Sequence, residues 1–175
     1  MTTTEMTVQE RASADMRAAS EVSRRVQIHE IKLVSCNARY DEDSTQEQLN
    51  YDMRFKTNTE LVAETKNLKV HMHFALMTEP RDENSTSSLF IEAQFLLTYV
   101  LDSTDGLDSA NYQSFGELNG RFNAWPYWRE FVQSITVRMG IPPLTVPSLK
   151  ITGTDSKVEP NSDATDRVVK SGGKS

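Results

Sequence analysis

Cysteine, glycine and proline are scarce in this chain of 175 residues, which contains one, seven and six of them. The lone cysteine, Cys36, excludes an internal disulfide framework and a cysteine-rich metal site, because both need several cysteines. No run of apolar residues approaches the roughly 20 that a membrane span requires. The first 25 residues also lack the apolar stretch of a secretory signal. We therefore expect a cytoplasmic protein without membrane insertion.

Clusters of lysine and arginine are missing as well, and the net charge is −6 at pH 7. Nucleic-acid binding needs such clusters to displace counterions from the phosphates. We therefore expect no nucleic-acid partner. Length and composition predict one domain of modest size.

Catalytic signatures are also absent. The sequence has no glycine-rich phosphate loop and no GxSxG, HExxH or CxxC motif. His71 and His73 are expected on one face of a strand, but two ligands are too few for a metal site. Gly116 and Gly120 form a GxxxG pattern with polar residues inside it, which is not a membrane dimer motif. These absences predict a protein that is not an enzyme and that uses no cofactor or metal.

The most informative stretch that is present is 123–149, which holds both tryptophans and four of the six prolines. Pro126 suits the first turn of a helix and Gly140 suits the left-handed position after its end. We therefore expect a helix over 126–139. Its apolar side chains recur at spacings of three and four, so they share one face. They are Trp128, Phe131, Val132, Ile135 and Met139.

The segment 141–149 that follows contains three prolines, which remove backbone donors and exclude helix and central strand. It still carries the apolar residues Ile141, Leu144, Val146 and Leu149. An extended apolar segment beside an aromatic helix predicts a groove wall that contains no nucleophile, base or metal ligand. The alternative is that the aromatic face only packs against a sheet or a neighbouring subunit.

Alternation of apolar and polar residues predicts half-buried strands at 49–56, 68–77 and 89–101. A first strand begins at Val26, and a shift in its parity predicts a bulge near His29 or Glu30. The connectors are too short for helical crossovers, so the sheet should be antiparallel.

A short helix capped by Asp108 or Ser109 should precede the long one. Its expected apolar face consists of Tyr112, Phe115, Leu118 and Phe122. Four strands followed by a short and a long C-terminal helix indicate an α+β fold with a four-stranded antiparallel sheet.

Both ends of the chain differ from the predicted domain, 25–151. Residues 1–24 should form an arm in which Thr7 and Glu10 can make the capping box of a helix. That arm either docks on the core or stays loosely ordered. Residues 152–175 are polar and poor in large apolar groups, which predicts a disordered tail.

The aromatic opening of the long helix and the double proline after it resemble a signature of the SecB export chaperones. The matching residues are Trp125, Pro126, Tyr127, Arg129 and Glu130, then Ile141, Pro142, Pro143, Leu144, Val146 and Pro147. A weaker match is the sequence VQIHEI at 26–31, which is similar to the family's opening strand. The resemblance covers 26–151 and implies the SecB-like fold.

The resemblance also implies a homotetramer, built as a dimer of dimers, with outer apolar grooves that hold unfolded polypeptide without ATP. Methionines and aromatic residues suit such a surface, because they can repack around many sequences. By analogy, the strand at 49–56 borders one side of the groove and 141–146 borders the other. The expected client-binding residues are Leu49, Tyr51, Met53, Phe55, Trp125, Trp128, Phe131, Ile141, Leu144 and Val146.

Export members of the family dock their motor ATPase, SecA, partly through acidic positions on the sheet. Two of these positions align with Ser35 and Arg39, whereas Glu92 matches a third, so we expect weakened SecA docking in which Glu92 is the retained contact. SecB-like proteins outside general export often serve toxin-antitoxin-chaperone modules, in which they hold one antitoxin. This dedicated function is the one we favour.

Two alternatives stay open. One is a general export chaperone that keeps preproteins competent for SecA and the Sec translocase. The other is an oligomeric scaffold without chaperone activity, in which the aromatic helix joins subunits and the groove is closed.

Overall fold

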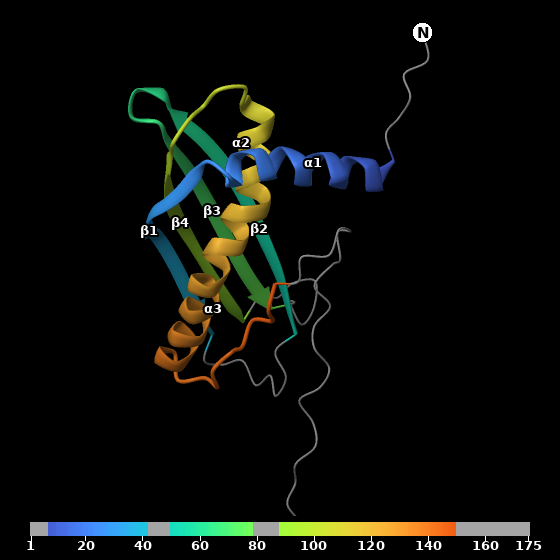
Figure 1. The fold of residues 1–175 in the computed structure, drawn as a ribbon. Coiled ribbons are helices and arrows are strands. Elements are labelled where there is room, and N and C mark those ends of the chain that lie inside the picture. Colours follow the sequence, from blue (N-terminus) through green and yellow to red (C-terminus); the bar gives the residue numbers. More distant parts are fainter. Residues whose placement is uncertain (1–6, 42–49, 79–87, 150–175) are drawn as a thin grey trace, which may run out of the picture.

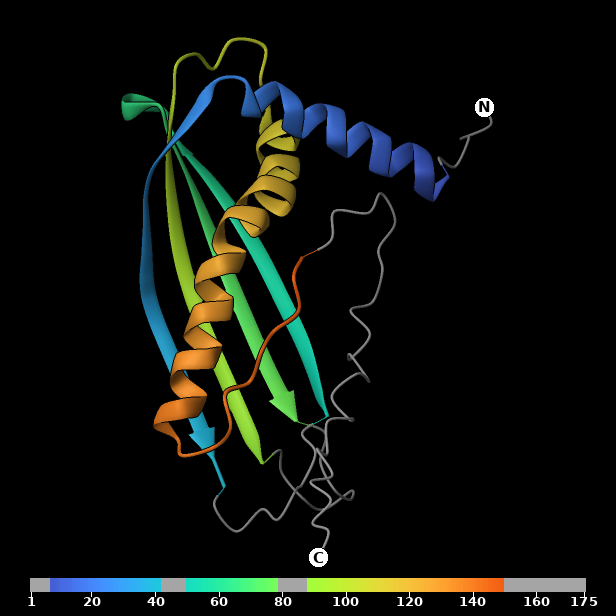
Figure 2. The ribbon, with the colours of Figure 1, turned by 60° about the horizontal axis from the view of Figure 1, so that its bottom comes forward.

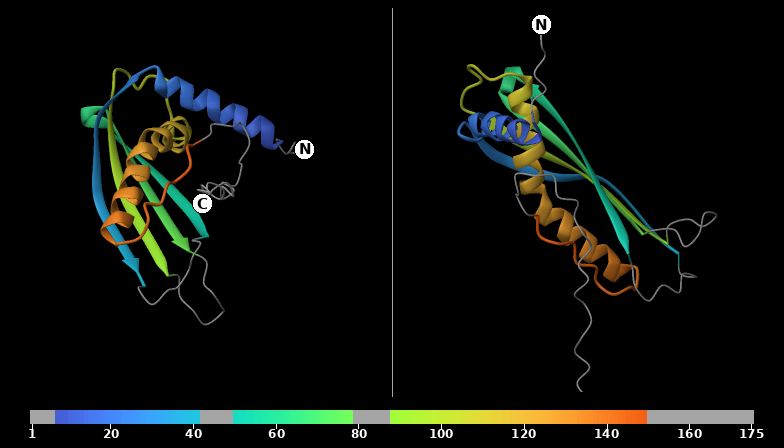
Figure 3. Two further views of the ribbon diagram at one scale, coloured as in Figure 1. Left: turned by 90° about the horizontal axis from the view of Figure 1, so that it is seen from below. Right: turned by 90° about the vertical axis from the view of Figure 1, so that its right-hand side faces the viewer.

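A four-stranded antiparallel sheet forms one layer of the protein, and the helices lie on one side of it (Figures 1 and 3). The structure is a computed structural model, and it describes residues 7–41, 50–78 and 88–149. The strand order is β1-β4-β3-β2, so β1 and β2 are the edges. The strands are β1 (Val26–Tyr40), β2 (Tyr51–Val62), β3 (Asn67–Thr78) and β4 (Leu89–Leu101).

Register shifts in β1 confirm the predicted bulge. One shift falls between Ile28 and Glu30, opposite Tyr99 and Thr98, and a second lies between Leu33 and Ser35. A bulge leaves an extra residue in one strand and increases the local twist. This is why Val26 and Ile31 could not be placed on one face by simple alternation.

A nearly continuous helical rod runs diagonally across the sheet (Figure 2). It consists of α2 (Ser109–Phe115), one π-helical turn η2 (Gly116–Gly120) and α3 (Arg121–Arg138). Asp108 begins the rod as the predicted cap: its carboxylate accepts from the Asn111 N–H at 3.0 Å, and the Asn111 side chain accepts from the Asp108 N–H at 3.0 Å. Gly140, with φ +77°, follows its end as predicted.

The predicted start of the long helix was wrong. Pro126 lies inside α3, five residues after its first residue Arg121, and costs the bond that an N–H there would make to the Phe122 carbonyl. The helix continues through this position because the residues just before the proline, Ala124 and Trp125, are buried at 0% and 4% exposure. Tertiary burial therefore outweighs the local preference of proline for a first turn.

The prediction that Phe122 shares the buried face of Tyr112, Phe115 and Leu118 was also wrong. Tyr112 and Phe115 are buried and Leu118 is half-buried, but the Phe122 side chain is 50% exposed. The π turn η2 adds a residue to one turn of the rod, which rotates everything after it by about 100°. Phe122 consequently points away from the sheet, and Ala124 and Trp125 take the buried positions instead.

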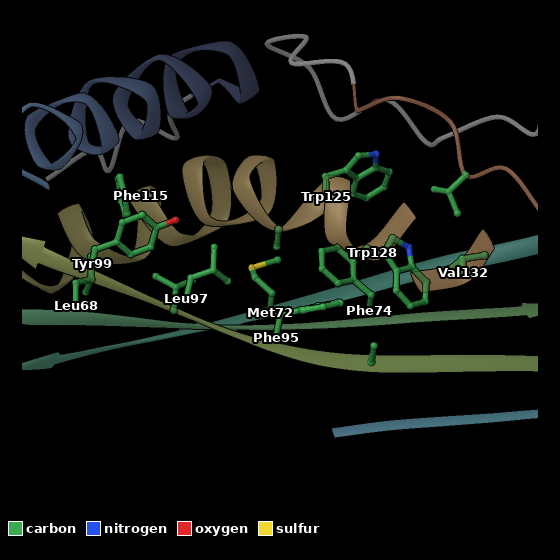
Figure 4. Packing of buried hydrophobic residues seen from close by; sticks show 14 of the residues in the cluster. Leu68, Met72, Phe74, Phe95, Leu97, Tyr99, Phe115, Trp125, Trp128 and Val132 are labelled. Carbon is green, nitrogen blue, oxygen red and sulfur yellow. The ribbon is translucent and has the colours of Figure 1, made fainter. Parts of the chain in front are cut away.

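The core lies between the rod and alternate residues of the two central strands, β3 and β4 (Figure 4). The Phe74 ring stacks on Trp128 at 5.4 Å between centroids and meets Trp125 edge-on at 5.8 Å. Further along the sheet, Tyr99 meets Phe115 edge-on at 4.9 Å. The alternation predicted for β3 is confirmed, because every second residue is buried at 0% exposure: Leu68, Val70, Met72, Phe74 and Leu76.

The N-terminal arm contains a helix, α1 (Val8–Ser23), that crosses the end of the rod and extends beyond it (Figure 1). The Thr7–Glu10 capping box that the sequence predicted is present. The second half of α1 docks on the core through Ala19 and Val22, which are 2% and 0% exposed. The domain boundaries at 24 and 151 stay predictions, and the expected disordered tail lies outside the described residues.

Within the described ranges, no helix is both long and apolar enough to cross a membrane.

Candidate functional site

The helix side of edge strand β2 presents apolar side chains at the margin of the core. Tyr51 and Met53 are half-buried there, and the Phe55 side chain is 44% exposed. The Arg121 guanidinium stands 4.5 Å above the Phe55 ring, so its charge and the exposed ring share one surface. Leu49, the first of the four residues predicted along this strand, lies outside the described residues.

A hydrogen bond joins β2 to one tryptophan of α3. The Trp128 indole N–H points to the Met53 sulfur at 3.3 Å. Thioether sulfur is a weak acceptor, and methionine adjusts its shape readily. Met53 therefore closes the core beneath the β2 margin with a side chain that can move without breaking a strong hydrogen bond.

Residues 141–149, here called the strap, turn back from the end of α3 and run beside it on the side that faces β2 (Figures 2 and 3). The strap has no helical or strand structure. Its start is fixed by the Ile141 N–H, which donates to the Thr136 carbonyl at 3.2 Å. The Leu144 N–H donates to the Thr136 hydroxyl at 3.1 Å, and that hydroxyl donates in turn to the Val132 carbonyl at 2.9 Å.

Two further bonds hold the far half of the strap by its carbonyl groups. Arg129 Nε donates to the Val146 carbonyl at 2.8 Å, and Trp125 Nε1 donates to the Pro147 carbonyl at 2.9 Å. The Arg129 guanidinium is thus directed at a backbone oxygen within the same chain.

The predicted client-binding residues fall into two groups. Trp125, Trp128 and Val146 are buried in the core, at 4%, 0% and 0% exposure, so they offer almost no surface in this conformation. The two tryptophans pack against the sheet, which is the alternative that the sequence had left open. The half-buried or exposed group lies around the strap and the β2 margin: Tyr51, Met53, Phe55, Phe131, Ile141 and Leu144.

A shallow cleft of about 260 Å³ opens along the seam between α3 and the strap. Its walls are Pro126, Arg129, Glu130 and Gln133 from α3, and Thr145 and Val146 from the strap. The strap and α3 therefore leave an open depression between them at the surface. Sequence reasoning missed Thr136 and Gln133 here, because both look like ordinary polar helix positions.

Two tyrosines on the helix side of the sheet have raised pKa values. Burial raises the pKa of Tyr51, and it raises the pKa of Tyr99 to about 12, so both phenols stay neutral near pH 7. The donors along the seam are an indole N–H, a guanidinium and a hydroxyl, which match backbone carbonyl and amide groups. In the described part of the chain, no group of three or more metal-ligating side chains comes together.

The opposite face of the sheet carries the residues aligned with SecA-docking positions. The Glu92 carboxylate lies 3.6 Å from His73 Nε2. Ser35 Oγ donates to Gln94 at 3.4 Å, and the Arg39 guanidinium stands 4.7 Å above the Phe90 ring. Glu92 thus lies beside a histidine on a face that also carries Arg39.

Comparison with known proteins found a curated relative and a solved structure that are similar to this chain. No family model matches the chain. It is 24% identical over 149 residues to the SecB-like chaperone Rv1957 of Mycobacterium tuberculosis strain H37Rv, a match that covers 76% of this chain and 82% of the relative. The structure of Rv1957 in complex with a ChAD peptide from the Rv1956 HigA1 antitoxin superposes with a TM-score of 0.68. That superposition has 23% sequence identity and covers 79% of this chain and 99% of the other.

These comparisons confirm the resemblance that the sequence predicted. Over most of its length, this protein is similar to the SecB-like chaperones, and it has their fold.

Proposed function

We propose that this protein is an ATP-independent SecB-like chaperone, a holdase that binds unfolded polypeptide and serves as the dedicated chaperone of an antitoxin in a toxin-antitoxin-chaperone module. One observation carries the proposal: β2 leaves apolar side chains at the margin of the core, with Phe55 44% exposed, and an extended segment is held by its backbone on the side of α3 that faces β2 (Figure 2). The M. tuberculosis protein of the same fold was solved with an antitoxin peptide bound. That complex supports an antitoxin as the client.

The mechanism is holding by burial. A client segment lays apolar side chains on Tyr51, Met53 and Phe55, which removes its apolar surface from water at roughly 25 cal/mol per Å². The chaperone binds the unfolded client and not the folded one, which keeps the client from aggregating. The fraction of client held is set by mass action. The sequence has no phosphate-binding loop, so release needs only folding of the client or capture by its partner.

The first experiment measures light scattering from a chemically denatured model protein diluted into buffer with and without the chaperone, in the absence of ATP. The wild type is expected to suppress aggregation at stoichiometric amounts. Phe55→Glu should weaken client binding about tenfold, since it replaces an apolar contact by a charge. Lys56→Glu is the matched control, because the neighbouring side chain projects to the other face of β2. Equal activity of both variants would favour the scaffold alternative.

Tyr51→Glu and Leu144→Glu extend this test to both sides of the seam. If the groove is closed and the helix only joins subunits, neither change should alter suppression of aggregation. Loss of suppression in Tyr51→Glu, with the wild-type oligomeric state retained, supports a groove bordered by β2. Loss in Leu144→Glu as well would make the strap a fixed wall of that groove.

The antitoxin is distinguished from secretory clients by purifying the tagged protein from its native host and identifying the bound proteins by mass spectrometry. One dominant partner with a toxin attached supports the dedicated function. A broad set of secretory precursors, together with measurable SecA affinity at low salt, would support general export instead. Undetectable SecA affinity would contradict export and the role of Glu92 as a docking contact.

We also propose that the protein works in the cytoplasm as a homotetramer. Edge strand β1 supports assembly, because it leaves Ile28, Leu33 and Val34 exposed at 48%, 47% and 53%. An unpaired edge with apolar side chains is a surface that a second chain can cover.

A further inference from the structure

Three side chains of α3 hold the strap by its backbone. Leu144 contributes its N–H, Val146 its carbonyl and Pro147 its carbonyl. In all three hydrogen bonds the partner is a side chain of α3. None of these bonds depends on which residue the strap carries at that position, provided that the chain is extended. The α3 surface therefore recognises the form of a polypeptide rather than a particular sequence.

Val146 is the fully buried side chain of the strap, at 0% exposure, while Ile141, Leu144 and Leu149 are half-buried against the core. Thr145 before Val146 is exposed and Pro147 after it is half-buried. Two of the three hydrogen bonds use carbonyl acceptors, which proline keeps. The occupant can therefore contain prolines, as the strap does at Pro143 and Pro147.

A shallow surface cleft also opens beside the strap. The cleft of about 260 Å³ runs along its seam with α3 and reaches Thr145 and Val146. After the Ile141 bond to Thr136, the described hydrogen bonds of the strap run to side chains rather than to a strand ladder. The strap is held by these bonds, by the buried Val146 and by three half-buried apolar side chains, so it can detach without breaking a hydrogen bond between strands.

The geometry points to a backbone-binding site on α3, built from Trp125 Nε1, Arg129 Nε and the Thr136 hydroxyl, which the strap occupies in the free protein. An extended polypeptide with one aliphatic residue, prolines tolerated, takes this site by displacing the strap. This inference rests on the proposed holdase function and defines the class of segment that the site accepts. Val146 is then a competitor of the client and not part of its binding surface.

The effect of Val146→Ala on client affinity should have one sign if the strap competes with the client and the opposite sign if the strap is a fixed wall of the groove. If the strap competes, the apparent dissociation constant for a client is its intrinsic value divided by the fraction of chains with the site open. Val146→Ala loosens the strap and increases that fraction, so binding should tighten, by about fivefold or more given the usual cost of truncating a buried aliphatic residue. If Val146 is a fixed part of the groove, the same change should weaken binding or leave it unchanged.

The test uses a fluorescein-labelled peptide with the strap's own sequence, IPPLTVPSL, and fluorescence anisotropy. Val146→Ala should bind it about fivefold more tightly than the wild type. Ser148→Ala, an exposed position on the same strap, should bind like the wild type. Equal or weaker binding by a folded Val146→Ala would overturn the inference.

Hydrogen exchange on the wild type gives a second measurement that does not depend on the variant. The Leu144 amide is protected by its bond to Thr136 in the free protein. Addition of saturating unlabelled peptide should accelerate exchange at Leu144, since the strap leaves the site. Unchanged or slower exchange at Leu144 would overturn the inference even if Val146→Ala fails to fold.

Failure of this inference and failure of the proposed function give different results. A wild type that does not suppress aggregation contradicts the holdase. A wild type that suppresses aggregation, while Val146→Ala gains no affinity for the peptide and Leu144 stays protected, contradicts only the displaceable strap.

Discussion

At the residue scale, two glycines set the distance between the helical rod and the sheet. A Cβ at Gly120 would lie 2.7 Å from Val70 Cγ1, and one at Gly116 would collide with the methyl group of Thr59. The sequence spacing of these glycines had only excluded a membrane dimer. These glycines allow the π turn to pack closely on strands β2 and β3.

Gly120→Ala tests this close approach. Alanine gains roughly 0.5–1 kcal/mol of helix propensity, but overpacking a full core costs roughly 1–3 kcal/mol, so the clash should dominate. Val70 cannot move aside easily, because it is β-branched and 0% exposed on a central strand. Urea unfolding should give a net loss of about 1 kcal/mol. Glu117→Ala, exposed on the same turn, is the control and should change stability by less than about 0.5 kcal/mol.

The raised pKa of Tyr99 predicts that the protein loses stability at alkaline pH. Its pKa in the folded protein is raised to about 12, first because the phenol is buried, while its Asn123 hydrogen bond acts in the opposite direction. Its contribution is fully present below the unfolded pKa of about 10 and is lost as pH rises toward 12. The stability lost over this range is on the order of 2 kcal/mol.

Denaturant unfolding at several pH values from 8 to 11.5 checks this prediction. Tyr99→Phe should reduce the alkaline slope of the unfolding free energy, although it also removes the 2.9 Å hydrogen bond from Asn123. A slope that is identical in the two proteins would show that other groups cause the alkaline loss.

At the element scale, α1 divides into two halves with different roles. Its second half is tied to α2: Asn111 Nδ2 donates to the Ala18 carbonyl at 3.3 Å, and Ser114 Oγ donates to Asp15 at 3.4 Å. Its first half leaves Val8 72% exposed and extends past the rod (Figure 3). Docking on the core, one of the two alternatives that the sequence left open, is thus present in the second half of α1.

Thr7→Ala should destabilise the first half of α1 without affecting the second half. Loss of the capping box costs a helix roughly 0.5–2 kcal/mol, but the first turn of α1 buries no residue of the core. Amide exchange of residues 8–12 should accelerate several-fold, while the melting temperature stays within about 1 °C of the wild type. A drop of several degrees would mean that the first turn packs on another part of the protein.

At the scale of the whole molecule, the apolar flank of β1 predicts assembly. Native mass spectrometry and light scattering after size exclusion should show four chains for the wild type. Val34→Glu places a charge at a residue that is 53% exposed on this edge, so it should shift the protein to smaller species if the edge is covered by another chain. Gln9→Glu adds the same charge at the far end of α1 and serves as the control.

The assembly state and the sheet content of Val34→Glu together decide whether β1 forms the interface. If Val34→Glu stays tetrameric, the β1 edge is not the interface and the exposed side chains have another use. If it dissociates but keeps its sheet, as measured by circular dichroism, the assembly depends on β1 and the fold does not.

The sequence by itself determined the elements whose information is local. Strict alternation placed β3 and β4, since every second side chain of a strand faces the same side. Polar caps at Thr7 and Asp108 placed the starts of α1 and α2, because a short side chain can bond to a backbone N–H three residues away. The aromatic and proline pattern at 125–147 also determined the resemblance to SecB-like chaperones.

Tertiary structure alone decided what depends on contacts between distant residues. The burial of Trp125 and Trp128 on Phe74, the outward turn of Phe122 and the position of Pro126 inside a helix all follow from how closely the rod approaches the sheet. The same holds for the strap, whose prolines predicted an extended chain but not its seat on α3. Local propensities differ by about 1 kcal/mol or less, whereas burial of one large side chain contributes roughly 1.5–3 kcal/mol, so packing decides wherever the two conflict.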